Sequence, residues 1–230
     1  MELPAAWQGR AEDGPLFDPC CGAGTIAIEA AQIACGIAPG LQRRFAFERL
    51  LPFAGEAERA QWQQLKSEAK ARIHASAVPI FASDVSFRMV DFARRNAQRA
   101  GVEASITFNG GDALERPAPP LPEGLPGTVM LNPPYGERIE VGGKAARASA
   151  QDRDTPSDFF ARLASHWKQA YTRHGAGWTA WVLSPDMKLP SAMRLKESRR
   201  VPMWNGPIEC RLYRFDLVAG SARAPRRESA

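Results

Sequence analysis

The segment PLFDPCCGAGTIAIEAA, residues 15–31, combines an acidic side chain with a glycine-rich turn. Asp18 follows a short apolar run, and Gly22 and Gly24 allow the backbone to turn sharply and to approach a ligand closely. From Thr25 onward, small and aliphatic residues recur at helical spacing. A strand, a tight turn and a helix N-terminus in this order form a ligand site in doubly wound α/β folds. The pattern also suits an ordinary strand–turn–helix unit with packing glycines.

The turn matches neither phosphate-binding fingerprint. It lacks the Lys-Ser/Thr pair of a P-loop and the third glycine of the dinucleotide motif. An acid before Gly-x-Gly instead suits a ligand that carries an amino group and ribose hydroxyls, and S-adenosylmethionine is such a ligand. We therefore predict that this turn binds S-adenosylmethionine.

A second candidate site lies in TVMLNPPY, residues 128–135, where an apolar strand runs into Asn132, Pro133, Pro134 and Tyr135. Two prolines cannot continue a sheet, and the residue before a proline is held extended, so the Asn132 side chain has a fixed direction. A carboxamide oxygen, the Pro133 carbonyl and an aromatic ring then lie together at one strand tip. Asn132, Pro133, Pro134 and Tyr135 are therefore candidate catalytic residues; the alternative is a proline-terminated strand with a packed tyrosine.

Strands and helices alternate along the chain, which predicts a parallel sheet with helices on both faces. The segments SRRVPMWN and PIECRLYRFDLV are expected to form a terminal antiparallel hairpin that turns at Asn205-Gly206. We expect further strands at 78–84, 105–109, 128–132 and 178–183, and further helices at 56–77, 86–100, 158–173 and 187–195.

Two acidic residues follow the next predicted strands. Asp84 ends the second strand, where a carboxylate can accept hydrogen bonds from ribose hydroxyls, and Ser86 is expected to begin the next helix. Asp84 capping that helix is the alternative. Asp112 follows the third strand, where it could bind the ligand or cap a turn. The candidate cofactor-binding residues are therefore Asp18, Pro19, Cys20, Gly22, Gly24, Thr25, Asp84, Val85 and Asp112.

Together these strings resemble the class I S-adenosylmethionine-dependent methyltransferases that modify exocyclic amino groups of nucleobases. Among these enzymes, the chain most resembles the large-subunit ribosomal RNA guanine-N2 methyltransferase family. The strings that carry this resemblance are DPCCGAGTIAIEAA, APGLQRRFAFE, FASDVS, NPPYGERI and NGPIEC. The resemblance implies a seven-stranded, mostly parallel Rossmann-like sheet. It also implies that Asp112 meets the adenine amino group of the cofactor, and that the substrate is large-subunit ribosomal RNA.

Other functions remain open at this point. Adenine-N6 DNA methyltransferases share the Asn/Asp-Pro-Pro-aromatic motif. Members of the resembled family usually carry a THUMP RNA-binding domain before the catalytic domain, and this chain reaches its first predicted strand after 14 residues. A non-catalytic cofactor- or RNA-binding module is therefore a further alternative. We expect a short N-terminal remnant (1–14), a methyltransferase domain (15–218) and a basic, disordered tail (219–230).

Composition sets wider limits. The 230 residues are 44% hydrophobic, enough for one large domain, and the net charge of +5 permits an anionic partner. The four cysteines form no Cys-x-x-Cys pair and the three histidines are scattered, which suggests no metal site and indicates reduced thiols in a cytoplasmic protein. No apolar run has membrane-spanning length, so no membrane partner is expected.

Three surface features complete the expectations. Six basic residues between 194 and 214 form the strongest candidate for phosphate contacts, against Glu197 and Glu209. Arg43 and Arg44 are interpreted as a solvated pair. An apolar stripe within 56–77 is interpreted as a core-facing helix side. The stripe contains Trp62, Leu65, Ala69 and Ile73.

Overall fold

The structure is a computed structural model that describes residues 7–133, 156–173 and 175–219. Seven strands form one sheet in the order β3-β2-β1-β4-β5-β7-β6. All neighbouring strands run parallel except β7, which is antiparallel to both β5 and β6. The predicted α/β class, the seven-stranded sheet and the antiparallel terminal hairpin are confirmed.

The elements follow the predicted alternation. The strands are β1 (Leu16–Asp18), β2 (Ile80–Asp84), β3 (Ile106–Gly110), β4 (Gly127–Leu131), β5 (Trp178–Ser184), β6 (Arg199–Asn205) and β7 (Ile208–Leu217). The helices are α1 (Thr25–Ala34), α2 (Glu56–Ala71), α3 (Phe87–Ala100), α4 (Pro156–Ala170) and α5 (Leu189–Met193), and Ala46–Arg49 forms a short 3-10 helix, η2.

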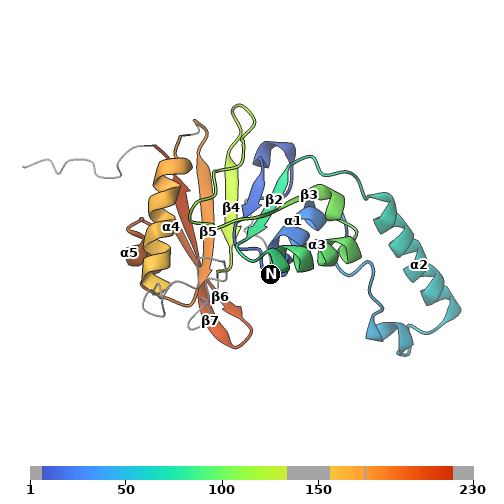
Figure 1. The fold of residues 1–230 in the computed structure, drawn as a ribbon. Coiled ribbons are helices and arrows are strands. Elements are labelled where there is room, and N and C mark those ends of the chain that lie inside the picture. Colours follow the sequence, from blue (N-terminus) through green and yellow to red (C-terminus); the bar gives the residue numbers. More distant parts are fainter. Residues whose placement is uncertain (1–6, 134–155, 174, 220–230) are drawn as a thin grey trace, which may run out of the picture.

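Helices cover both faces of the sheet, as Figure 1 shows. On one face α1 and α3 pack their small and branched side chains against alternate strand residues such as Leu16 and Ile80. On the other face α4 buries Leu163 and Trp167 against strand residues that include Val129. Successive strand side chains point to opposite faces, and a parallel sheet covered on both sides therefore has strands that are apolar throughout.

The parallel strands bring their carboxyl ends to one edge of the sheet, hereafter the catalytic edge. Asp18 lies opposite Ala82, and Asp84 lies opposite Gly110, so the residues that follow these strands are neighbours in space. Leu131 pairs with Val182, which places the start of the Asn132 turn beside the end of β5. Ligands of open α/β sheets bind at this edge.

The C-terminal hairpin differs from the prediction by one residue. Asn205 pairs with Ile208, so the two-residue loop is Gly206-Pro207 rather than Asn205-Gly206. Gly206 has a φ of 62°, which glycine adopts without strain, and Pro207 needs no backbone donor in the loop.

The interpretation of α2 as a core-facing helix is wrong. Ala69 is its only buried residue, while Leu65 and the following Ile73 are 50% and 43% exposed. Figure 1 shows α2 and η2 standing away from the sheet as a lateral projection. Residues 38–73 are called the arm below. The spacing of apolar residues correctly predicted an amphipathic helix. It could not show that the apolar side of this helix is not packed into the core of the sheet.

The beginning of the described chain packs on the domain. Trp7 is buried against the α1–α3 face, and its indole nitrogen donates a hydrogen bond to the Gly14 carbonyl at 3.2 Å. Residues 1–6 and the basic tail 220–230 lie outside the described residues. No helix of the described part is long and apolar enough to span a membrane.

Candidate active site

The glycine turn after β1 is a compact loop with open space beside it. The Gly24 amide donates a hydrogen bond to the Cys21 carbonyl at 2.7 Å. Gly24 is the N-cap residue of α1. Gly24 has a φ of 87°, and a Cβ there would lie 2.9 Å from the Ala93 Cβ of α3. Gly22 has a φ of 50°, and nothing lies within 4 Å of the place a Cβ would occupy. The loop therefore packs tightly on α3 at Gly24 and leaves room for a ligand at Gly22.

Asp84 joins the glycine turn to the end of β2. Its Oδ2 accepts a hydrogen bond from the Gly22 amide at 2.9 Å, and its Oδ1 accepts one from the Ser86 amide at 2.9 Å. Asp84 therefore also holds the backbone at the start of α3, which is the alternative role considered for it. Ser86 occupies the N-cap position of α3, but its side chain makes no cap hydrogen bond. A carboxylate has about four acceptor sites, so Asp84 retains capacity for a ligand.

Burial controls the charge of Asp18 at the end of β1. Its side chain is 1% exposed, and its Oδ1 accepts a hydrogen bond from the Cys20 amide at 3.2 Å. Desolvation raises the pKa of Asp18 to about 8, the Cys20 bond opposes this rise, and the nearby charge of Asp84 adds to it. The folded carboxyl therefore holds its proton at neutral pH. Because the unfolded carboxyl ionises near its ordinary value of 3.8, the free energy of unfolding decreases as the pH rises from about 4 to about 8 and then levels off.

Three carboxyl groups converge around the Cys20 thiol. Burial raises the pKa of Cys20, and the charges of Asp18, Asp84 and Asp112 raise it further, so the thiol stays protonated. Asp84 and Asp112 add negative charge at the strand tips, which disfavours phosphate, and carboxyl oxygens accept hydrogen bonds from ammonium and hydroxyl donors. The structure therefore brings together the acidic residues that the sequence singled out.

The remaining predicted cofactor residues lie around this cluster. Asp112 accepts a hydrogen bond from the Leu114 amide at 2.9 Å through Oδ1, so it does cap a turn. Val85 is half-buried beside Asp84, Pro19 is buried, and Thr25 is exposed at the N-terminus of α1. Each of them belongs to the catalytic edge.

The Asn132 turn follows β4 at the same edge. Leu131 is fully buried, Asn132 is half-buried and Pro133 is buried, so the Asn132 backbone is held between two anchored neighbours. The strand ends at Leu131, one residue earlier than predicted. Pro134 and Tyr135 lie outside the described residues.

One supporting residue carries no recognisable sequence signal. Asn96 of α3 donates a hydrogen bond from Nδ2 to the Ala23 carbonyl at 2.8 Å and so braces the glycine turn from a neighbouring helix. A polar residue three positions after Ala93, on the side of α3 that faces α1, is the only hint the sequence offers.

Three of the six basic residues in the predicted phosphate-contact region at the hairpin form ion pairs. Arg200 pairs with Glu197 at 2.5 Å, Arg211 with Glu209 at 2.7 Å, and Arg214 with Asp216 at 3.0 Å. These pairs are partly exposed and contribute little to stability, but they reduce the positive charge available to a phosphate.

Within the described ranges, no group of three or more histidine, cysteine, aspartate or glutamate side chains could hold a metal ion.

Comparison with known families now bears on this geometry. A family model described as the RMKL-like methyltransferase domain matches residues 6–214. The chain belongs to this methyltransferase family. A curated relative from Shewanella loihica, named "Ribosomal RNA large subunit methyltransferase K/L", is 37% identical over 228 residues. That alignment covers 97% of this chain but 29% of the relative, so the chain spans less than a third of the curated protein.

Solved structures agree on the fold. A methyltransferase crystallised with SAH superposes with a TM-score of 0.71 at 27% identity, over 92% of this chain and 50% of that chain. A protein from Listeria monocytogenes, named a predicted N6-adenine-specific DNA methylase, has a TM-score of 0.67 at 27% identity, over 89% of this chain and 47% of that chain. SAH is S-adenosylmethionine after loss of its methyl group, and the class of cofactor predicted for this methyltransferase is confirmed.

Proposed function

We propose that this methyltransferase domain transfers a methyl group from S-adenosylmethionine to the exocyclic N2 of a guanine in large-subunit ribosomal RNA. The observation that carries the proposal is the placement of an acidic, phosphate-repelling cluster and the Asn132 turn on one edge of the sheet. The name of the Shewanella relative supports ribosomal RNA as the substrate.

The acidic cluster fits the cofactor by its chemistry. Asp18 would accept hydrogen bonds from the amino group of the methionine part, Asp84 from the ribose hydroxyls, and Asp112 from the adenine amino group. The space at Gly22 would admit the ligand close to the backbone. The walls of the cofactor site would be completed by Pro19, Cys20, Thr25 and Val85.

Asn132 addresses the main chemical difficulty of the reaction. An exocyclic amine is a poor nucleophile because its lone pair is delocalised into the ring. When the Asn132 side-chain oxygen and the Pro133 carbonyl accept its two N–H groups, the lone pair is directed toward the methyl carbon. The cofactor supplies a methyl group already activated by a sulfonium, so alignment provides much of the remaining rate enhancement.

The proton balance requires no dedicated base. As the base nitrogen bonds to the methyl carbon, the carbon–sulfur bond breaks and leaves a neutral thioether. The alkylated nitrogen then becomes acidic and loses its proton to water. Tyr135 is proposed to stack on the target base, a contact worth roughly 1–3 kcal/mol. Pro134 would stiffen the turn between them.

Cofactor affinity should depend on pH through Asp18. A cationic amino group favours the ionised carboxylate, so binding must expel the proton that Asp18 holds below about pH 8. We expect the affinity for S-adenosylmethionine to rise by up to about tenfold per pH unit toward pH 8 and then to level off. Calorimetry across this range measures it, and Asp18→Asn should bind more weakly with a flat profile. A flat profile in the unaltered chain would contradict the assignment of Asp18.

The proposed function is tested by transfer of a labelled methyl group to unmodified large-subunit ribosomal RNA and, in parallel, to DNA. Label in RNA alone is expected. A second candidate, an adenine-N6 DNA methyltransferase, is favoured by the name of the Listeria neighbour. Label in DNA alone would support that candidate.

A further inference from the structure

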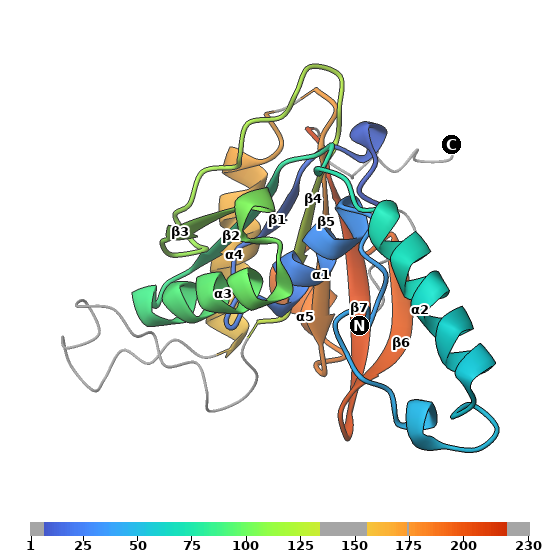
Figure 2. The same cartoon turned by 90° about the vertical axis from the view of Figure 1, so that its right-hand side faces the viewer.

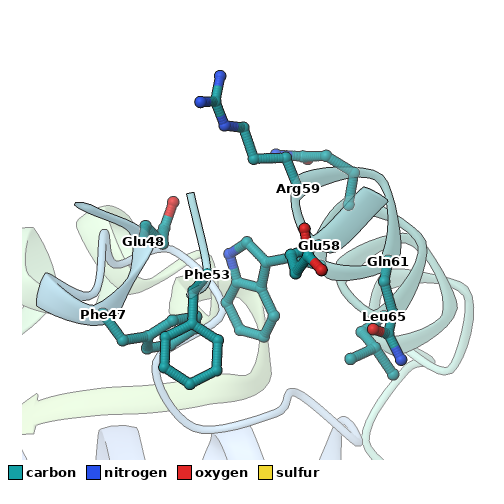
Figure 3. Close-up of a pocket in the computed structure, with 9 residues that line it drawn as sticks. Phe47, Glu48, Phe53, Glu58, Arg59, Gln61 and Leu65 are labelled. Atoms are coloured by element: carbon teal, nitrogen blue, oxygen red, sulfur yellow. The ribbon is translucent and has the colours of Figure 1, made fainter. Parts of the chain in front are cut away.

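The arm carries a cleft outside the proposed active site. The cleft has a volume of about 480 Å³ and is lined on one side by Phe47 and Phe53 and on the other by residues of α2 that include Leu65. Figure 3 shows these side chains facing each other across the opening. It lies between η2 and α2 and belongs to none of the strand tips.

Aromatic rings form the floor of the cleft. Phe47 and Trp62 pack edge to face with ring centroids 5.2 Å apart, and Phe53 meets Phe47 in the same way at 5.6 Å. Phe53 nevertheless remains 47% exposed, and the neighbouring Leu51 is 88% exposed. A small cluster that keeps a ring open to solvent offers a surface for another flat, apolar group.

The segment that carries Phe47 and Phe53 also carries exposed basic side chains. Arg43, Arg44 and Arg49 are exposed, and none forms an ion pair with the described residues. The lining of the cleft also includes Glu48, Glu58 and Arg59, and the Glu48 Oε1 accepts a hydrogen bond from the Phe45 amide at 2.8 Å. The three exposed arginines differ from Arg200, Arg211 and Arg214 of the hairpin, which are paired with acids.

Basic side chains interleaved with exposed aromatic rings are the combination that binds single-stranded nucleic acid. The rings stack on bases irrespective of sequence, and the arginines neutralise phosphates. Figures 1 and 2 show η2 at the end of the arm toward which the parallel strands point. RNA held at the catalytic edge could thus extend along the arm.

We propose that the arm binds a single-stranded segment of the substrate RNA outside the target nucleotide, with a base on Phe53 and phosphates on Arg43, Arg44 and Arg49. This inference rests on the proposed function. It replaces the interpretation of Arg43 and Arg44 as a solvated pair. It also explains why the apolar residues Leu65 and Ile73 remain exposed.

The charge part is tested with the triple variant Arg43→Gln/Arg44→Gln/Arg49→Gln. Binding of a fluorescein-labelled, mixed-sequence single-stranded oligoribonucleotide is followed by anisotropy at several salt concentrations. We expect at least about tenfold weaker binding and a slope of log affinity against log salt reduced by about 2, because three contacts each contribute about 0.7. The matched control, Arg94→Gln/Arg95→Gln/Arg99→Gln on α3, removes the same charge elsewhere and should retain most of the affinity and slope.

The stacking part is tested with Phe53→Ala. Loss of one stacked base, worth roughly 1–3 kcal/mol, should weaken binding about 5- to 150-fold with the salt slope unchanged. Phe53→Leu keeps apolar bulk without an aromatic face and should bind almost as weakly. Calorimetric titration with S-adenosylmethionine should give unaltered affinity for every variant, which shows that the domain remains folded.

The outcomes separate this inference from the proposed function. If the arm variants bind RNA like the unaltered chain, or if the α3 control loses as much affinity, the inference is overturned. Unchanged RNA binding with an altered sedimentation coefficient would show that the cleft holds protein instead, which also overturns it. Arm-dependent RNA binding without methyl transfer to ribosomal RNA would support the RNA-binding arm and contradict the proposed function.

Discussion

Replacing Asn132 with alanine is expected to lower turnover roughly 10²–10³-fold, the loss typical of a hydrogen-bond partner that acts mainly in the transition state. The half-buried Asn132 is held after β4 by the buried Pro133, so the backbone of the turn should survive the substitution. The affinity for S-adenosylmethionine should stay nearly normal because the acidic cluster is untouched. Single-turnover methyl transfer and calorimetry measure the two quantities separately.

Asn132→Asp provides the matched comparison. It keeps a side-chain acceptor oxygen in the same place, and we expect it to retain more activity than Asn132→Ala. Equal loss of turnover and cofactor affinity in the alanine variant would indicate a folding defect. Normal turnover in that variant would remove Asn132 from the mechanism.

Replacing Asp84 with alanine should instead act on the cofactor. The substitution removes the acceptor of both the Gly22 and the Ser86 amides, so it loosens the glycine turn and deletes the proposed ribose partner. Each hydrogen bond to a charged group is worth about 1.5–3 kcal/mol, and we expect the dissociation constant for S-adenosylmethionine to rise about 10- to 100-fold. Calorimetry measures the change directly.

Asp84→Asn is the control for this prediction. It preserves the shape and one acceptor oxygen, so its effect should be smaller than that of alanine. Chemical denaturation of both variants reports any loss of fold stability. Unchanged affinity in a folded Asp84→Ala variant would show that the ribose role is wrong.

The catalytic edge was predictable from sequence because each acid lies at the end of a predicted strand or just after it. Parallel strands end at the same edge, so Asp18, Asp84 and Asp112 had to lie near one another once the alternation of elements was recognised. The hairpin was predictable for a similar local reason, although Pro207 moved its turn by one residue.

The arm could not be predicted, because the sequence gives the apolar stripe of a helix but not the distance to its partner. Leu65 and Ile73 occupy the stripe as core residues would, yet both are exposed. The pairing of charges at the hairpin was closer to prediction. Glu197 lies three residues before Arg200 and Glu209 two residues before Arg211, and the structure shows that both of these local pairs form.

The hydrogen bond between Gly22 and Asp84 is another feature of the site that sequence could not predict. It joins residues 62 positions apart and depends on the spacing of β1 and β2. Likewise, the raised pKa of Asp18 follows from burial that composition cannot reveal. Sequence identified the acids, and the structure shows that Asp84 anchors the loop while burial raises the pKa of Asp18.

The most direct test of the central claim is the identity of the methylated nucleoside. Unmodified large-subunit ribosomal RNA is treated with this chain and S-adenosylmethionine, digested to nucleosides and analysed by mass spectrometry, with Asn132→Ala as the blank. The account predicts N2-methylguanosine that is absent from the blank. N6-methyladenosine, or no methylated nucleoside from a chain that still binds S-adenosylmethionine, would contradict it.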